Sequence, residues 1–342
     1  MAKVSIQIIT WNSLRFIFDC LESLMRQSYR DFSILIIDNG SDDGTVEFIR
    51  SQYPTVSVLQ NFKNLGFAKA NNQGIQLAKG DYVLVMNPDV ILDNDFLQQL
   101  VIFADQHPEA GSFGGKTLKL HTEAIDSNDQ AGLREVVKSN IIDSTGLEIY
   151  KSRRVVNRGE GVKDKGQYDR MEEVFGVSGA CALYRLSALK EVMVRNDFFD
   201  QDFFAYKEDV DLAWRLRLYG WICWYVPQAL CYHHRRLASY PGSGIKKTFK
   251  RRREVSKMLR ALSFRNHHLM LIKNDQLLNI ALTLPWVLTR ELKVLFYAIF
   301  FEPFQYKSMA RFFQLLPAMF LKRRVIMAHK KVSPREIRRW FK

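Results

Sequence analysis

The chain has 342 residues, of which 47% are hydrophobic, and a formal net charge of +14. This length allows one large domain or two, and the apolar content excludes an intrinsically disordered chain. Lys and Arg concentrate in the last third, whereas residues 1–110 are not basic. The basic region favours an anionic membrane surface, nucleic acid or a polyanionic substrate as its partner.

The cysteines and the apolar runs indicate in which cellular compartment the protein lies. Cys20, Cys181, Cys223 and Cys231 form no CxxC pair, which predicts buried thiols in a reducing compartment. The first residues lack the apolar core of a signal peptide, and the longest apolar candidate, 277–289, is too short to span a bilayer. We therefore expect a cytoplasmic protein without a transmembrane helix.

Strands and helices alternate through the first quarter of the chain. Apolar runs predict strands at 4–10, 32–37, 56–59 and 82–86, and helical spacing predicts helices after Ser13, at 45–52 and at 67–77. Short links between them predict an α/β fold with a mostly parallel sheet and right-handed crossovers.

Polar side chains follow each of these strands. They are Thr10, Asn12, Asp38, Asn64, Asn87 and Asp89. Ligands of open α/β sheets bind at the carboxyl edge of the strands, so these residues are expected to line one crevice.

The strand at 82–86 ends at Asn87-Pro88-Asp89. Pro88 has no backbone donor and stops the strand. The tripeptide is typical of a plain turn, but a carboxylate held here also suits a divalent cation and, through it, a diphosphate.

Asp38 has two interpretations. Its carboxylate can accept a hydrogen bond from the N3–H of a pyrimidine, or it can cap the next helix. Neither GxGxxG nor GxxxxGK[ST] occurs, which argues against a Rossmann dinucleotide site and a P-loop.

The alternation stops between 121 and 173, where the sequence is polar and rich in glycine. So long an irregular stretch is either a binding loop or a surface excursion. A strand is predicted at 174–184, with small residues that would allow a ligand to approach closely.

A second chemical cluster contains Glu208 and Asp209, just before a helix that stops at Gly220. Carboxylates favour a helix start, and in a partly dry site one could also act as general base. A further strand is predicted at 221–227, followed by His233 and His234. On an extended chain at most one of them faces the crevice, as a surface residue or as a metal ligand.

The last hundred residues combine basic and apolar segments. Residues 245–253 are mostly basic, and 269–304 and 312–327 are apolar with basic borders. Such helices either lie on an anionic bilayer or pack onto the rest of the protein. The sequence contains no nucleic-acid module, so no nucleic acid is expected as partner.

Taken together, the ordered motifs over about residues 3–240 resemble the family 2 glycosyltransferases of GT-A fold, in particular their bacterial rhamnosyltransferase-like members. The resemblance rests on Ile9-Thr10-Trp11-Asn12, Asp38-Asn39-Gly40-Ser41-Asp42-Asp43, Asn64-Leu65-Gly66-Phe67-Ala68 with Asn71-Asn72, Asn87-Pro88-Asp89, Ser178-Gly179-Ala180, Glu208-Asp209-Val210-Asp211-Leu212 and His233-His234.

The resemblance implies a role for each matching position. Asp38 would read the pyrimidine, and the nucleotide sugar would be bound by Thr10, Asn12, Asn64, Gly66, Phe67, Asn71, Asn87 and Asp89. Asp89 would ligate Mg²⁺ or Mn²⁺, with His233, or alternatively His234, as a further ligand. Asp209 would be the catalytic base and Glu208 its neighbour. Asn87 stands where the family has the first acid of its DxD motif, which puts a carboxylate role at that position in doubt.

The resemblance also implies a GT-A domain at 1–240, with a nucleotide-sugar half at about 1–115 and an acceptor half at about 116–240, followed by a helical region at 241–342. The implied activity is inverting transfer of rhamnose from dTDP-rhamnose, or of another sugar from a dTDP or UDP donor, to a cell-envelope glycan or a polyprenyl-linked acceptor at the inner face of the membrane. Alternatives are a sugar-nucleotide pyrophosphorylase and an inactive glycan- or membrane-binding protein.

Overall fold

The computed structural model describes residues 2–124, 134–234 and 255–342. Its centre is one twisted sheet whose main strands are β1 (Val4–Thr10), β2 (Phe32–Asp38), β3 (Ser57–Gln60), β4 (Tyr82–Met86), β6 (Ala110–Ala124), β11 (Cys181–Arg185) and β12 (Ile222–His233). From one side of the sheet to the other the order is β12-β6-β11-β4-β1-β2-β3.

The directions of these strands follow from their pairing. β3, β2, β1 and β4 are parallel neighbours, β11 runs antiparallel between β4 and β6, and β6 and β12 are parallel again. The predicted α/β fold with a mostly parallel sheet is therefore confirmed. Because β4 and β12 run in the same direction, their carboxyl ends reach the same edge of the sheet.

Apolar side chains alternate between the two faces along each strand. One face packs against α1 (Leu14–Met25), α2 (Thr45–Gln52) and α4 (Phe96–Gln106). The other packs against α3 (Phe67–Leu77), α5 (Leu186–Glu191) and α6 (Glu208–Leu218). In β4, Leu84 and Met86 point to the first face, and Val83 and Val85 point to the second. All four cysteines are buried and free, as predicted.

Several sequence expectations need correction. Within the described residues, 121–173 is not one irregular loop, because it holds the end of β6 and the strands β7 (Arg134–Ser144), β8 (Leu147–Ile149), β9 (Val155–Asn157) and β10 (Glu172–Glu173). β8, β9 and β10 have only two or three residues each, too few to show a local period of two residues, and β7 pairs with β6 through register irregularities.

Other boundaries shift. The strand expected at 174–184 is only β11, because residues 174–180 contain a bend, a turn and a single isolated bridge between Gly176 and Leu147 instead of a strand. The strand expected at 221–227 continues to His233 through an irregularity between Val226 and Leu230. Ser13 lies at the start of α1 but makes no side-chain cap. Glu208 begins α6 rather than preceding it.

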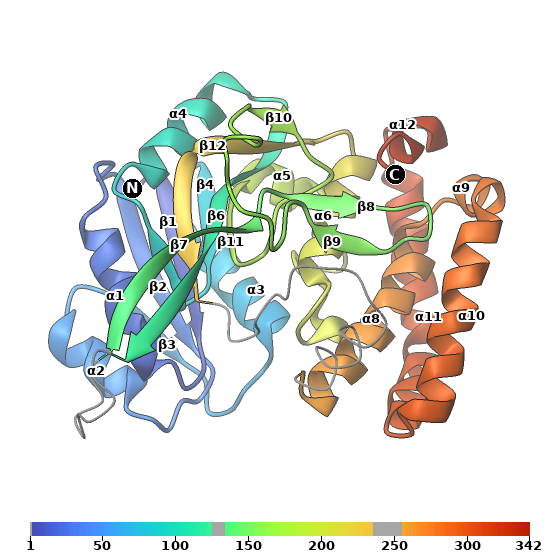
Figure 1. Ribbon diagram of the computed structural model, residues 1–342, viewed down its shortest axis with the longest axis horizontal. Helices are drawn as coiled ribbons and strands as arrows, with labels where there is room; N and C mark the ends of the chain where they lie inside the picture. The colour runs from blue at the N-terminus through green and yellow to red at the C-terminus, as the bar shows by residue number, and fades with distance from the viewer. Residues whose placement is uncertain (1, 125–133, 235–254) are drawn as a thin grey trace.

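The C-terminal helices are α8 (Lys257–Asn274), α9 (Leu277–Leu282), α10 (Leu284–Phe301), α11 (Gln305–His329) and α12 (Pro334–Arg338). They stand on the side of the molecule opposite α1 and α2 (Figure 1). Apolar residues of α8 and α11, such as Leu269 and Met319, share a core with α6. The expected boundary at residue 240 and the basic segment 245–253 lie outside the described residues.

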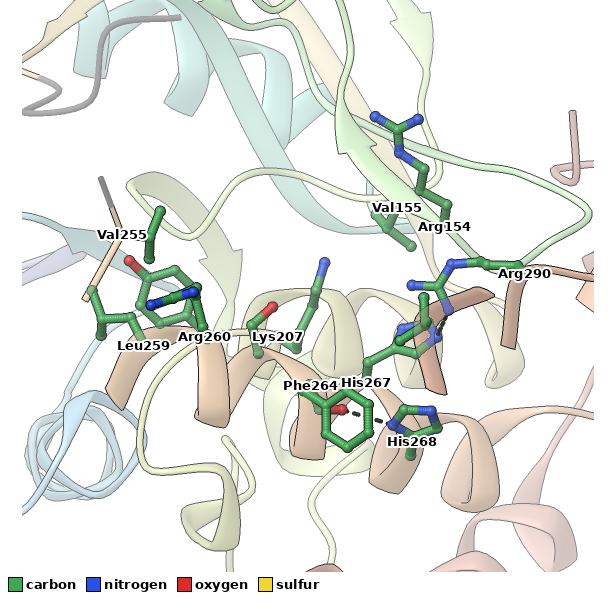
Figure 2. A pocket seen from close by; sticks show the side chains of 13 residues that line it. Arg154, Val155, Lys207, Val255, Leu259, Arg260, Phe264, His267, His268 and Arg290 are labelled. Atoms are coloured by element: carbon green, nitrogen blue, oxygen red, sulfur yellow. Dashed lines mark hydrogen bonds between the residues drawn. The ribbon is translucent and has the colours of Figure 1, made fainter. Parts of the chain in front are cut away.

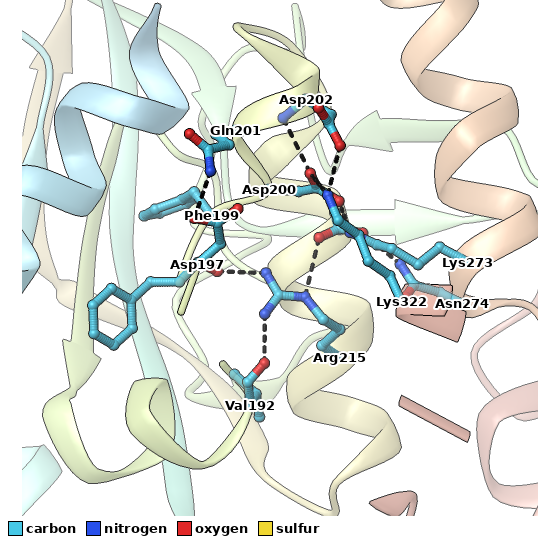
Figure 3. A network of polar contacts seen from close by, with 12 residues as sticks. Val192, Asp197, Phe199, Asp200, Gln201, Asp202, Arg215, Lys273, Asn274 and Lys322 are labelled. Atoms are coloured by element: carbon cyan, nitrogen blue, oxygen red, sulfur yellow. Dashed lines mark hydrogen bonds and ion pairs between the residues drawn. The ribbon is translucent and has the colours of Figure 1, made fainter. Parts of the chain in front are cut away.

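A buried ion network fastens these helices to α6 (Figure 3). Lys273 of α8 contacts Asp200 (2.5 Å) and Asp211 of α6 (2.7 Å), and Lys322 of α11 contacts Asp200 (2.5 Å). Arg215 pairs with Asp211 at 3.0 Å on α6 itself. Although burial opposes it, the pKa of Asp200 lies below its usual range because of the two lysine charges. None of the described helices is long and apolar enough to cross a membrane.

Candidate active site

Asp38 and Thr10 end neighbouring strands at the carboxyl edge of the sheet. They are register partners in β1 and β2, and the Thr10 hydroxyl donates to Asp38 Oδ1 at 2.8 Å. The same carboxylate accepts from the backbone N–H groups of Gly40 (3.0 Å) and Ser41 (2.9 Å) and from the Ser41 hydroxyl. Since an ionised carboxylate has about four acceptor sites, these four hydrogen bonds occupy the Asp38 carboxylate and close the turn after β2. Asp38 does not cap the next helix, because α2 begins without a side-chain cap. Reading a pyrimidine, which stays a prediction, requires Asp38 to exchange partners.

Asn12 connects the first two strand-end loops. It is exposed, has a left-handed backbone (φ 51°), and its Oδ1 accepts from the N–H of Asp42 at 3.0 Å. Its own N–H donates to the Ser41 hydroxyl at 2.9 Å. Asn12 therefore lies exposed at the carboxyl edge of the sheet, where it links the loops that follow β1 and β2.

The loop after β3 brings Asn64, Gly66 and Phe67 to the same edge. Asn64 Oδ1 accepts from the Gly66 N–H at 2.8 Å, and Gly66 has φ 85°. A Cβ at Gly66 would lie 2.5 Å from the Phe204 ring, so only glycine fits here. The Phe67 ring is half-buried and contacts that of Phe199.

Asn71 points into the interior of the protein. It is fully buried, its Oδ1 accepts from Gln7 at 2.8 Å, and its amide donates to the Phe67 carbonyl at 2.9 Å. This geometry fixes the start of α3 against β1, so we expect any contribution of Asn71 to nucleotide binding to be indirect.

Asp89 and His233 meet because a short strand follows Asp89. β5 (Val90–Leu92) pairs antiparallel with the end of β12, which sets Val90 opposite His233. His233 Nε2 lies 3.3 Å from Asp89 Oδ1, and its Nδ1 lies 2.9 Å from Asp143 Oδ2. Burial lowers the pKa of His233, but the hydrogen bonds to the two carboxylates outweigh it and raise the value to about 10.

The two adjacent histidines have different surroundings. His234 packs its ring on Phe16 of α1 at 4.9 Å between centroids, and burial lowers its pKa. His233, not His234, has its ring against the Asp89 side chain. Asp143, on β7, was not singled out from the sequence because no pattern links it to residues 54 or 90 positions away.

The donor set fits a divalent cation that is shared with a substrate. A metal-bound histidine commonly donates its second N–H to a carboxylate, as His233 does to Asp143. Mg²⁺ is often held by one or two protein ligands together with substrate phosphates, and Asp89 and His233 could supply these two. No group of three or more His, Cys, Asp or Glu ligands occurs in the described part of the chain.

The carboxylates at the start of α6 differ in environment. Asp209 is half-buried, and its two oxygens accept from the N–H groups of Gly179 (3.1 Å) and Val210 (2.8 Å). Glu208 is 7% exposed, and its Oε2 has no hydrogen-bond partner among the described residues. Burial, followed by the charge of Asp209, raises the pKa of Glu208 to about 8. Glu208 therefore holds its proton at neutral pH, whereas Asp209 is firmly oriented.

One short segment joins the two clusters. The Asn87 N–H donates to the Ala180 carbonyl at 2.8 Å, while the Gly179 N–H binds Asp209. The Asn87 side chain is half-buried and makes no hydrogen bond to any described residue. Residues 178–180 thus lie between the Asp89 edge and the Asp209 carboxylate.

The C-terminal region contributes a residue that sequence reasoning missed. Phe204, Tyr206 and Lys207, immediately before Glu208, have left-handed backbones. The amide nitrogen of Asn266, fully buried on α8, lies within 2.9 Å of the carbonyls of Phe203, Ala205 and Tyr206. Asn266 thereby holds a strained loop beside Asp209. A single asparagine in a helix gives no sequence signal for this.

Comparison with known proteins decides the family. The model of glycosyl transferase family 2 matches residues 5–193. The chain belongs to this family and is a glycosyltransferase. A second model, glycosyl transferase family group 2, matches residues 134–288.

Two relatives of this glycosyltransferase illustrate the similarity. An N-acetylglucosaminyl-diphospho-decaprenol L-rhamnosyltransferase of Mycobacterium tuberculosis is 31% identical over 233 residues, covering 63% of this chain and 70% of the relative. A poly-beta-1,6-N-acetyl-D-glucosamine synthase of Staphylococcus epidermidis is 26% identical, covering 67% of this chain and 49% of the relative.

Solved structures confirm the GT-A fold. S. aureus TarS, residues 1–349, aligns with a TM-score of 0.53 at 15% identity, covering 99% of this chain and 90% of that one. GalNAc-T7, solved with UDP, GalNAc and Mn²⁺, aligns with a TM-score of 0.57 at 14% identity, covering 79% and 48%.

Proposed function

We propose that this glycosyltransferase moves rhamnose from dTDP-rhamnose, with inversion, to a cell-envelope glycan or a lipid-linked acceptor. The observation that supports the proposal is the segment 178–180, which hydrogen-bonds to Asn87 at one end and orients the Asp209 carboxylate at the other. The similarity to the mycobacterial rhamnosyltransferase supports the choice of sugar and of a lipid-linked acceptor.

In this proposal the two clusters divide the work. An acceptor hydroxyl attacks the anomeric carbon from the face opposite the nucleoside diphosphate. The bond from that carbon to the diphosphate oxygen breaks, and the electron pair leaves with the diphosphate. Asp209 takes the proton of the hydroxyl, and its two backbone hydrogen bonds keep it aimed.

Glu208 has a supporting role here. With its pKa raised to about 8, it stays neutral beside Asp209 and avoids a second negative charge near the base. Thr10, Asn12, Asp38, Asn64 and Asn71 would shape the nucleotide side of the crevice, in part by holding its loops.

A bound Mg²⁺ or Mn²⁺ would neutralise charge on the departing diphosphate. Asp89 and His233 are the residues that would hold it, and Asp143 would fix the His233 ring. Asn87 would not contribute a charge, so substrate oxygens would complete the ligand set.

We also place the protein at the inner face of the cell membrane. α10 exposes Leu292, Phe296 and Phe300 at four-residue spacing, and α11 exposes Phe313 and Phe320. An exposed apolar face of this extent on a basic protein fits binding to an anionic bilayer surface.

Calorimetry with UDP, dTDP, GDP and CMP, with and without Mn²⁺, tests the proposal. We expect dTDP to bind most tightly, and we expect Asp89→Ala to abolish the dependence of dTDP binding on Mn²⁺.

Transfer activity should fall at least a hundredfold in Asp209→Asn, while dTDP binding stays unchanged. Binding of GDP alone would contradict the pyrimidine donor, and silence with every nucleotide would favour the inactive binder. Release of pyrophosphate from a nucleoside triphosphate and a sugar phosphate would favour the pyrophosphorylase.

A further inference from the structure

A cationic pocket of about 380 Å³ lies between the start of α6 and the C-terminal helices (Figure 2). Its charged lining comes from three parts of the fold: Arg154 beside β9, Lys207 at the start of α6, and Arg260 and Arg290 on α8 and α10. These parts are more than 45 residues apart in sequence, so tertiary packing alone creates this concentration of positive charge.

Two of the four cations are already neutralised. Arg260 pairs with Glu302 at 2.5 Å, and Arg290 pairs with Glu291 and also contacts His267. Arg154 and Lys207 have no carboxylate partner within hydrogen-bond distance among the described residues.

Lys207 lies near two further positive charges of the pocket, those of Arg154 and Arg290. Burial lowers its pKa; the Asp209 carboxylate opposes this shift, and the charges of Arg290 and Arg154 add to it. Bringing like charges together in a half-buried pocket costs free energy, and a bound anion would offset that cost.

The residues that line the pocket indicate which kind of anion would bind there. The guanidinium group of Arg154 and the ammonium group of Lys207 suit phosphate oxygens, which arginine binds in a bidentate manner. Val294 of α10 lines the pocket, and the exposed apolar residues Leu292, Leu295 and Phe296 lie on the same helix. A charged head would therefore have an apolar surface beside it.

We propose that this pocket binds the diphosphate of a polyprenyl-type acceptor lipid, whose apolar chain lies along α10. The inference rests on the proposed function, and it specifies the acceptor side of that site. Lys207 immediately precedes Glu208 and Asp209, so a diphosphate held there leaves the sugar attached to it next to the proposed base.

The test is calorimetric titration of the full-length protein with farnesyl diphosphate. We expect farnesyl diphosphate to bind, farnesol not to bind, and dTDP not to displace the bound farnesyl diphosphate. The affinity should weaken roughly 10- to 100-fold in Arg154→Gln/Lys207→Gln, because each substitution removes a charge-assisted contact.

The matched control is Arg170→Gln/Lys190→Gln, which removes the same charge from exposed positions away from the pocket. Its affinity for farnesyl diphosphate should stay within twofold of wild type. Arg154→Gln alone, at an exposed residue, repeats the measurement without risk to folding.

Two results would overturn the proposal. The first is evidence that the diphosphate binds outside this pocket: either dTDP displaces farnesyl diphosphate, or the pocket and control variants lose the same affinity for it. The second is an equal loss of affinity for phosphatidylglycerol vesicles in the pocket variant, which would make the pocket a site for bulk lipid headgroups. A wild type that binds no nucleotide would refute the proposed function, whereas the farnesyl diphosphate titration would still report on the pocket.

Discussion

At the scale of single residues, Gly179 governs how closely the chain can approach the proposed base. Its N–H binds Asp209 Oδ2, and a Cβ at this position would lie 2.9 Å from Asp209 Cβ. Side chains do not tolerate so short a contact, so any larger residue must push Asp209 aside.

We therefore expect Gly179→Ala to lower kcat by about tenfold or more, because a small displacement of a catalytic group is costly. The Kd for dTDP should stay within twofold, since the strand-end loops are untouched. Steady-state kinetics and calorimetry measure the two quantities. An unchanged kcat would show that Asp209 does not act from its observed position.

The raised pKa of Glu208 predicts how the stability of the protein depends on pH. Its folded-state pKa is about 8 against an ordinary value near 4.5, so between these values the folded chain holds a proton that the unfolded chain has released. Wild-type stability should therefore fall as the pH rises from 4.5 to 8, by an amount on the order of a few kcal/mol.

Glu208→Gln, which cannot ionise, should lack this loss. Thermal melts should show little difference from wild type at pH 4 and a variant that is more stable by a few degrees at pH 8.5. A difference in melting temperature between Glu208→Gln and wild type that does not change with pH would mean that Glu208 is ionised in the folded protein.

At the scale of elements, α6 is held by ionic contacts as well as by apolar packing. Lys273, with a side chain only 1% exposed, contacts Asp200 and Asp211 and so links α8 to α6. Removing one member of such a network leaves buried charges uncompensated.

Lys273→Met should accordingly lower the free energy of unfolding by about 3–5 kcal/mol. The matched control is Lys331→Met, which breaks the exposed pair with Glu191 and should cost no more than about 1 kcal/mol. Chemical denaturation measures both variants. Equal losses would indicate that water reaches the Lys273 network.

At the scale of the whole molecule, the central sheet and α10 lie on different sides (Figure 1). Phe296 and Phe300 are 58% and 65% exposed, and their rings lie 4.6 Å apart on α10.

Phe296→Ser/Phe300→Ser should weaken binding to phosphatidylglycerol vesicles about 100-fold, because two buried phenyl groups contribute roughly 3 kcal/mol or more. Phe62→Ser is the control, since Phe62 is fully exposed on the loop after β3. Vesicle co-sedimentation at low and high salt compares the variants. Equal binding by all three proteins would exclude α10 as the contact surface.

The N-terminal sheet could be predicted from the sequence because its signals are local. The structure has the predicted bounds at β1, α2, α3 and β4, since each element is a continuous apolar or amphipathic segment ended by its own turn residues. The family could be recognised for a related reason. Its motifs follow strand ends, where chain order alone brings Thr10, Asp38 and Asp89 to one edge.

Only the tertiary structure determines which partners those residues meet. His233 reaches Asp89 through the pairing of β5 with β12, Asp143 joins them from β7, and Asn266 supports the loop before Asp209 from α8. The tertiary structure also supplies the hydrogen-bond donors to Asp38 and brings Arg154 and Lys207 together in one pocket. Contacts between residues tens of positions apart depend on strand register and helix packing, which no local pattern encodes.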